Sequence, residues 1–160
     1  MKDNFYLLKA NDNVKNEISK IANCNKILNK YGININEKEV MKIAKRRTES
    51  LKQYGRIELG DWIIPKIIKE FSDSPYVSQK NFSNTICELI DIFYYYKNET
   101  KDLIGDEKLI EFMKKYYDEL AHGDLDYLSS KIMEKMKKNI LEDKKMDFEI
   151  IEEKGDYDEF

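Results

Sequence analysis

The chain has 160 residues, of which 41% are hydrophobic and 37% charged, and its net charge at pH 7 is −3. This length and composition predict one folded domain with its own core, and the small net charge argues against a nucleic-acid coat or a strongly membrane-attracted surface. No apolar run approaches the roughly 20 residues of a spanning helix, and residues 1–13 lack the hydrophobic region of a signal peptide. We therefore expect a cytoplasmic protein. The widely spaced Cys24 and Cys87 fit buried thiols rather than a disulfide framework.

Apolar residues at helical spacing predict helices along most of the chain. The first predicted helix carries an apolar stripe over residues 14–31 and ends at Gly32, which suits a left-handed C-cap. Asn36 and Glu39 form a capping box at the start of the second, which stops at Gly55.

The third predicted helix is short, begins near residues 60–64 with Pro65 in its first turn, and ends at the SDSPY segment. Ser78 is predicted to cap the fourth and longest helix, which runs to about Asn98. The apolar face of this helix consists of Phe82, Ile86, Leu89, Phe93 and Tyr96.

Three consecutive tyrosines in ELIDIFYYYKNET, residues 88–100, cannot share one face of a regular helix. At about 100° per residue, Tyr96 falls in the core, Tyr94 at its edge and Tyr95 on the outer side. The run is therefore interpreted as packing rather than as an aromatic binding platform. Lys97 lies toward the apolar face, so it must reach solvent or meet a carboxylate.

Gly105 and Asp106 are predicted to begin a fifth helix that ends at AHG, and Asp124 to cap a sixth with its stripe over residues 125–140. Strand-like alternation is confined to MDFEII, residues 146–151. The predicted fold is therefore all-α, a single-domain irregular bundle of five to six helices with an acidic C-terminal tail.

The C-terminal tail, residues 142–160, carries nine acidic side chains against three lysines. We expect a helical domain over residues 1–141 followed by this tail, which is not an independent domain. A further hypothesis is that residues 146–160 fold back on the lysine-rich surface of the sixth helix or on a neighbouring groove, held mainly by their apolar side chains.

A polar cluster is the candidate site. Arg47 falls on the apolar stripe of the second helix, where a buried guanidinium needs a carboxylate, and Lys97 makes the same demand. Glu58, Glu70 and Glu99 are the expected partners. The cluster comprises Arg47, Arg56, Glu58, Lys97 and Glu99. A structural ion-pair network is the favoured interpretation, and a pocket for a small anion or carboxylate-bearing ligand stays open beside it.

No catalytic residue, metal ligand or cofactor site is expected, and an enzyme is not favoured. His122, directly before Gly123, suits contact with helix C-terminal carbonyls better than proton abstraction. One histidine and two scattered cysteines do not make a zinc site, and Cys87 among apolar residues suits an inert thiol. The DLD segment at residues 124–126 lacks the glycine and glutamate of a calcium loop.

Three segments carry a family resemblance: YGININEKEVMKIAKRRTESLKQYGRIELG, IIKEFSDSPYVS and FYYYKNETKDLIGDEKLIEFM. They resemble the matching segments of an uncharacterised domain-of-unknown-function family of short bacterial proteins, from about Cys24 to Leu128. The resemblance implies a small helical cytoplasmic protein with no established activity, cofactor or partner. The chain departs from the family pattern at LGDWI and at AHGDL, which weakens any role for His122.

Three function hypotheses follow. The leading one is a non-catalytic adaptor or regulatory protein that binds another protein through an exposed groove. The first alternative is a small-molecule or anion binder, or an enzyme, that uses Arg47, Glu58, Lys97 and Glu99. The second is a nucleic-acid-binding regulator that uses the basic residues of the second helix, and it is disfavoured by the net charge. The expected partner is thus a protein, with no membrane and with a small-molecule ligand left open.

Overall fold

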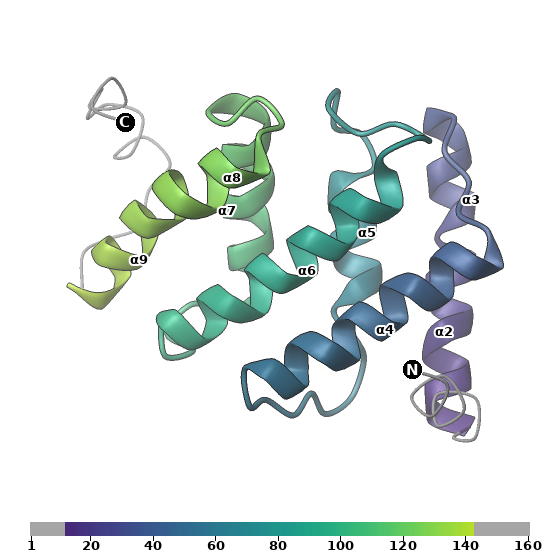
Figure 1. Cartoon of the computed structure of the whole chain (residues 1–160), viewed down its shortest axis with the longest axis horizontal. Coiled ribbons are helices and arrows are strands. Elements are labelled where there is room, and N and C mark those ends of the chain that lie inside the picture. The colour runs from purple at the N-terminus through teal and green to yellow at the C-terminus, as the bar shows by residue number, and fades with distance from the viewer. Residues whose placement is uncertain (1–11, 143–160) are drawn as a thin grey trace. The chain divides into compact units, whose positions relative to one another are not determined.

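The computed structural model describes residues 12–142, which form helices joined by turns and contain no strand (Figure 1). The prediction of an all-α fold is confirmed for this part of the chain. None of its helices is both long and apolar enough to cross a membrane. The predicted strand at residues 146–151 and the hypothesis that the acidic tail docks lie outside the described residues.

The helices follow one another along the chain as α2 (Asp12–Asn23), α3 (Asn25–Leu28), the 3-10 turn η1 (Asn29–Tyr31), α4 (Glu37–Gln53), α5 (Ile64–Phe71), α6 (Phe82–Glu99), α7 (Asp106–Glu119), α8 (Leu125–Tyr127), the π-helical turn η2 (Leu128–Ile132) and α9 (Met133–Leu141). The chain divides after Tyr94, within α6, into two compact units. The prediction of one helical domain over residues 1–141 stays a prediction.

The helix boundaries predicted at Gly32, Asn36 and Gly55 are observed, but the single helix predicted over residues 14–31 is divided at Cys24 into α2, α3 and η1. The Asn36 Oδ1 accepts from the Glu39 N–H at 2.8 Å, and the Glu39 Oε1 accepts from the Asn36 N–H at 3.0 Å, which completes the capping box of α4. Gly32 follows η1 with φ 75°, and Gly55 follows α4 with φ 64°. Both glycines adopt the left-handed conformation that ends a helix without a Cβ clash.

The predicted start of α6 at Ser78 is wrong. The Ser78 N–H donates to the Asn81 side chain at 2.8 Å and the Asn81 N–H donates to the Ser78 carbonyl at 3.2 Å, so these residues close a turn on themselves. The first hydrogen bond of α6 then runs from the Thr85 N–H to the carbonyl of Asn81, the residue directly before the helix, at 2.9 Å. The Asn81 side chain therefore decides the boundary.

The tyrosine run has the alternating burial that helical geometry predicts. Tyr96 is buried and Tyr95 is exposed, and the predicted apolar face of α6 is buried at Phe82, Ile86, Leu89 and Phe93. Tyr94, however, is buried rather than at the edge of the core. The loop between α4 and α5 brings Glu58 onto its hydroxyl, a contact that helix periodicity does not contain.

The second unit contains a helix interruption that the sequence analysis missed. Asp124 caps α8 as predicted, with its side chain accepting from the Tyr127 N–H at 3.0 Å. The helix then widens into η2 before α9, whereas one continuous helix was predicted. Inside η2 the Ser129 carbonyl accepts a hydrogen bond from the buried Tyr96 hydroxyl. A side-chain donor at a helix carbonyl competes with the regular ladder and accounts for the wider turn.

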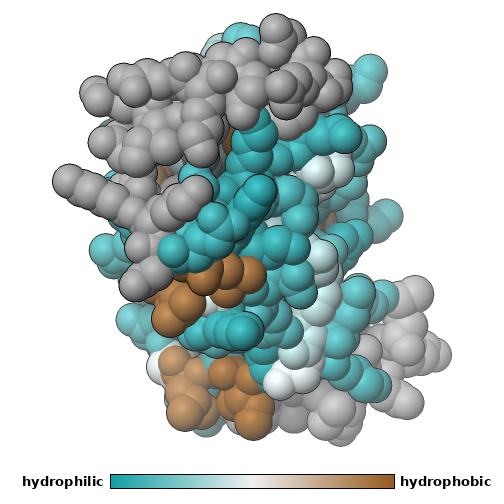
Figure 2. Space-filling view, turned by 90° about the vertical axis from the view of Figure 1, so that its left-hand side faces the viewer, coloured by the Kyte–Doolittle hydropathy of each residue, from teal (hydrophilic) through white to brown (hydrophobic). Residues whose placement is uncertain are grey.

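Most of the surface in Figure 2 is hydrophilic, and apolar residues reach the surface there in separate small areas. Single exposed apolar residues are normal on soluble proteins. An exposed apolar side chain indicates a binding surface more strongly when it lies on a segment whose backbone is held by buried contacts.

Candidate functional site

Arg47 lies on the inner face of α4 and is 8% exposed, as its place on the apolar stripe predicts. Its Nε donates to Oε1 of Glu58 at 2.6 Å, and its guanidinium carbon lies 3.9 Å from the centroid of the Trp62 ring. Glu58 and Trp62 both belong to the loop between α4 and α5. The buried cation is thus neutralised by a carboxylate and covered by an aromatic face, the two contacts that a buried guanidinium needs.

Tyr94 engages the second oxygen of Glu58. Its hydroxyl donates to Glu58 Oε2 at 2.6 Å from α6. Burial of the ring, together with the Glu58 carboxylate, raises the pKa of Tyr94 well above its ordinary value, although Arg47 opposes this shift. Tyr94 is therefore a neutral hydrogen-bond donor, and both oxygens of Glu58 have partners.

The far end of the same loop is held by α2. The buried Glu17 accepts a hydrogen bond from the Trp62 backbone N–H at 2.9 Å. Lys20 pairs with Glu17 at 2.9 Å and with Asp61 at 3.1 Å. We call residues 56–62 the anchored loop, because α4, α6 and α2 all hold it.

Two aliphatic residues stand exposed between these attachment points. Ile57 is 85% exposed and Leu59 is 88% exposed, while Glu58 between them turns inward to Arg47. The loop therefore presents two large apolar side chains on a fixed backbone. The sequence analysis named Glu58 and Arg56 here but missed Ile57 and Leu59, although the Ile-Glu-Leu alternation between two glycines is a readable signal.

Lys97 satisfies its charge locally in the second unit. It is 6% exposed, and its Nζ donates to the Ile104 carbonyl at 2.7 Å. Its carboxylate partners are Asp106 at 2.8 Å and Asp102 at 3.6 Å, neither of which was expected as a partner of Lys97. Lys97 therefore holds the turn between α6 and α7.

The residues of the candidate cluster form ion pairs that are each described separately. Arg47 meets Glu58, Lys97 meets Asp102 and Asp106, and Glu99 pairs with Lys137 at 3.2 Å. Arg56 is half-buried in the anchored loop, and Glu70 lies exposed on α5. That Arg47, Arg56, Glu58, Lys97 and Glu99 form one cluster stays a prediction.

The remaining chemical candidates are one exposed histidine and two buried thiols. His122 is exposed in the turn after α7 with φ 49°. Cys24 and Cys87 are buried free thiols, and burial raises the pKa of each. Within residues 12–142, no three His, Cys, Asp or Glu side chains are grouped to hold a metal ion. The arrangement around Arg47 can fix a loop, and it offers no activated nucleophile or base.

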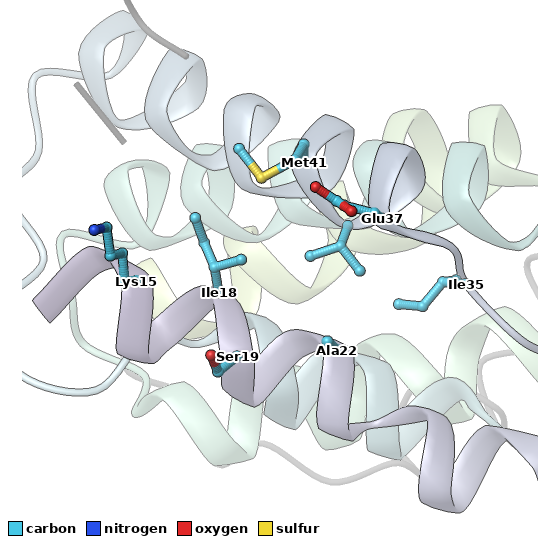
Figure 3. A pocket seen from close by; sticks show the side chains of 8 residues that line it. Lys15, Ile18, Ser19, Ala22, Ile35, Glu37 and Met41 are labelled. Atoms are coloured by element: carbon cyan, nitrogen blue, oxygen red, sulfur yellow. The ribbon is translucent and has the colours of Figure 1, made fainter. Parts of the chain in front are cut away.

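A pocket of about 570 Å³ lies between α2 and the start of α4 (Figure 3). We call it the α2–α4 groove. Ile18 rises from α2 toward Met41, with Lys15 at one end and Ile35 toward the other. Its lining is Lys15, Ile18, Ser19, Ala22, Ile35, Glu37, Val40 and Met41. A second pocket, of about 580 Å³, lies over η2 and α9 and has four lysines in its lining.

Comparison with known proteins assigns a family but no activity. No curated protein and no solved structure matches the chain significantly. The model of one family, described as a family of unknown function, matches residues 20–146. This range contains the anchored loop and the ion pairs of Arg47, Lys97 and Glu99, and it exceeds the resemblance expected from Cys24 to Leu128. The chain belongs to this family of unknown function, DUF6323.

Proposed function

We propose that the chain is a non-catalytic protein-binding protein, an adaptor or regulatory subunit, that contacts its partner through the anchored loop. One observation carries this proposal: Ile57 and Leu59 are 85% and 88% exposed on a loop whose backbone is held by Glu58 and Trp62. A partner that buries both side chains gains apolar contact without ordering the loop. The partner that fits is a protein with an apolar cleft.

These two side chains supply part of the energy that a specific contact needs. Full burial of an Ile or Leu side chain stabilises by about 1.5–3 kcal/mol. Because the loop is already held in place, little conformational entropy is lost on binding, and more of this burial energy remains as net binding free energy. Ile57 and Leu59 are therefore the expected centre of the interface, with Arg56 and Asp61 at its polar rim.

The buried Arg47 supports protein binding over anion binding. Its guanidinium already has Glu58 at 2.6 Å and Trp62 at 3.9 Å, and both oxygens of Glu58 are engaged. An anionic ligand would have to displace Glu58 and expose its charge. The favoured role of Arg47 is to hold the loop.

The basic residues of α4 are interspersed with acids. Lys38 lies between Glu37 and Glu39, and Lys45 lies 3.7 Å from Glu49. Nucleic-acid binding requires several cations that act together on phosphates. This mixed face supports a protein partner rather than a phosphate backbone.

We also propose that the protein acts in the cytoplasm of a bacterial cell. The buried, free thiols of Cys24 and Cys87 suit a reducing compartment. Fractionation of the host cell, with a periplasmic and a cytoplasmic marker followed in parallel, tests this location.

The test of the proposed function begins with a photo-crosslinking amino acid in place of Ile57 in the host cell. The crosslinked protein is identified by mass spectrometry, purified, and titrated against wild type and variants. Ile57→Asp and Leu59→Asp are expected to weaken binding at least about tenfold each, which corresponds to 1.4 kcal/mol. Both positions are exposed, so the urea midpoint is expected to stay unchanged.

The matched control is Leu103→Asp, because Leu103 is also an exposed aliphatic residue, at 65%, on a loop of the second unit. It is expected to bind as wild type. Equal affinity of wild type and Leu59→Asp for the crosslinked protein would contradict the proposal. A steep loss of affinity with salt would instead point to phosphate contacts.

A further inference from the structure

We propose that the α2–α4 groove is the docking site of the chain's own N-terminal segment, whose apolar residues Phe5 to Leu8 would enter it. This inference goes beyond the proposed function, since it concerns a different surface from the anchored loop. It rests on the lining of the groove, on where the described chain begins, and on the sequence of residues 1–11.

The groove has a mostly apolar lining, with Lys15 at one end and Glu37 toward the other. Ile18 and Ala22 contribute from α2, and Val40 and Met41 from α4 (Figure 3). Its volume of about 570 Å³ is in the range of about 300–1,000 Å³ that accommodates a small ligand. A short apolar peptide segment fits such a site through helix-groove packing.

The chain enters the described structure beside this groove. The first described residue, Asp12, lies one helical turn before Lys15, which stands at one end of the groove. The lining of α2 from Lys15 to Ala22 extends over about 10 Å at 1.5 Å per residue. Four residues, from Leu8 to Asp12, reach up to about 14 Å when extended, so Phe5 to Leu8 can return along the groove.

The sequence of residues 1–11, MKDNFYLLKAN, has the matching chemistry. Four consecutive apolar residues are flanked on both sides by charged and amide side chains. Asn11 favours the reversal of direction needed directly before α2. A segment that turns back from Asp12 brings Lys2 toward Glu37, at the end of the groove away from Lys15.

Tethering favours this occupant over a separate chain. A segment linked by a few residues has an effective concentration in the millimolar range, so a weak apolar contact keeps the groove filled. A second copy or another protein would have to compete with it. Docking of the segment therefore leaves the anchored loop as the surface for partners.

The test is NMR of the full chain labelled with ¹³C at the methionine methyl groups. Met41 reports on the groove, and Met113 and Met133, which are buried in the second unit, serve as internal references. Combined Leu7→Glu and Leu8→Glu substitutions are expected to move the Met41 resonance and to leave both references in place. The matched control, Asn4→Glu, adds charge to the same segment without changing its apolar residues, and it is expected to leave Met41 unmoved.

A dilution series and a peptide distinguish the possible occupants. The Met41 resonance of wild type is expected not to change on dilution, and a dilution-dependent shift would assign the groove to a second copy and overturn the proposal. Residues 1–11 added as a peptide at millimolar concentration are expected to move Met41 of the Leu7→Glu, Leu8→Glu chain toward wild type. A Met41 resonance that is identical in every variant would also overturn it. Ile57→Asp is expected to leave the Met41 resonance unmoved. The Met41 resonance therefore tests docking in the groove alone, and partner affinity tests the anchored loop alone.

Discussion

Arg47 stacks on Trp62, with its guanidinium carbon 3.9 Å from the ring centroid, while its Nε donates to Glu58 at 2.6 Å. One α4 side chain thus contacts two residues of the anchored loop, on either side of the exposed Leu59. A planar guanidinium can stack and pair at the same time, whereas a lysine ammonium cannot. Arginine at position 47 can therefore make both contacts at once, and lysine there would lose one of them.

The first prediction is that Arg47→Met lowers the free energy of unfolding by about 3–5 kcal/mol, because it leaves the Glu58 carboxylate buried without its cation. Glu58 keeps only 14% of its side-chain surface exposed, so solvent cannot replace Arg47. Urea unfolding followed by circular dichroism measures the loss. Trp62 fluorescence, from the only tryptophan, is expected to report the release of the loop.

Two companion variants make this prediction specific. The double variant Arg47→Met, Glu58→Leu is expected to recover part of the lost stability, since it removes both buried charges. Arg46→Met, on the neighbouring half-buried position, is expected to change stability by no more than about 0.5 kcal/mol. A loss below about 1 kcal/mol for Arg47→Met would contradict a buried pair.

The second prediction concerns Lys97. Lys97→Met removes the donor of the Ile104 carbonyl and the cation of Asp106, so we expect a loss of about 2–4 kcal/mol in the free energy of unfolding. Amide exchange of residues 100–105 is expected to accelerate more than that of α7. Uniform acceleration across both segments would show that Lys97 does not hold this turn in particular.

The third prediction uses the strain of the same turn. Lys101 and Asp102 are consecutive non-glycine residues with φ of 55° and 58°. A left-handed conformation costs an L-residue roughly 1–2 kcal/mol, a cost that glycine avoids because it has no Cβ, although its larger unfolded-state entropy cancels part of this gain. Lys101→Gly is therefore expected to stabilise by up to about 1 kcal/mol in urea unfolding. Glu111→Gly, at an exposed position in the interior of α7, is the control, and a loss of roughly 1 kcal/mol is expected there.

Helix positions and burial followed from the sequence because they depend on local signals. The capping box at Asn36 and Glu39, the C-terminal Gly32 and the inward direction of Arg47 are each set by residues within a few positions of one another. Periodicity alone placed Tyr95 outside and Tyr96 inside. These features need no knowledge of how distant segments meet.

The missed features depend on contacts between distant segments. Glu17 meets the Trp62 backbone from 45 positions away, and Tyr94 meets Glu58 from 36. The π-helical turn at Ser129 follows from a hydroxyl on α6. Lys97 and Asp106 lie within one loop of each other in the sequence, so their pairing was within local reach, but only glutamates were expected as partners of Lys97. The Ile-Glu-Leu alternation places Glu58 opposite Ile57 and Leu59, but the contact of Glu58 with Arg47 decides that the two aliphatic residues are the exposed ones.

The fourth prediction is that both cysteines react slowly. Burial raises the pKa of the Cys24 and Cys87 thiols, so little thiolate is present near neutral pH. Labelling by a disulfide reagent is expected to follow the opening of the fold and to accelerate in urea. Asn16→Cys places a thiol at an exposed position of α2 outside the α2–α4 groove and is expected to react at once. An immediate reaction of two thiols in the wild-type chain would contradict the burial of both.

The last prediction concerns pH and the carboxylate of Glu134. Burial alone would raise its pKa, but hydrogen bonds from Lys137 and Tyr96 outweigh burial and lower the pKa below the ordinary value of 4.5. The Tyr96 hydroxyl shares its single proton between the Glu134 carboxylate, at 2.6 Å, and the Ser129 carbonyl, and burial raises the pKa of this tyrosine, so it stays a protonated donor. A carboxyl with a lowered folded pKa binds a proton less readily in the folded than in the unfolded chain. Its stabilising contribution is therefore present above pH 4.5 and is lost as the pH falls through the folded pKa.

Glu134→Gln is accordingly expected to unfold at lower urea than wild type at about pH 7, by no more than about 1 kcal/mol, because the side chain is 39% exposed and its ion pair is screened. The difference is expected to shrink toward zero at about pH 3, where the wild-type carboxyl is protonated as well. Tyr96→Phe removes one of the two donors, so the pKa of Glu134 is expected to rise and the loss of stability to begin at higher pH. Carboxyl ¹³C shifts of Glu134 measure that pKa directly. An unchanged pKa in Tyr96→Phe would show that Lys137 alone holds the carboxylate.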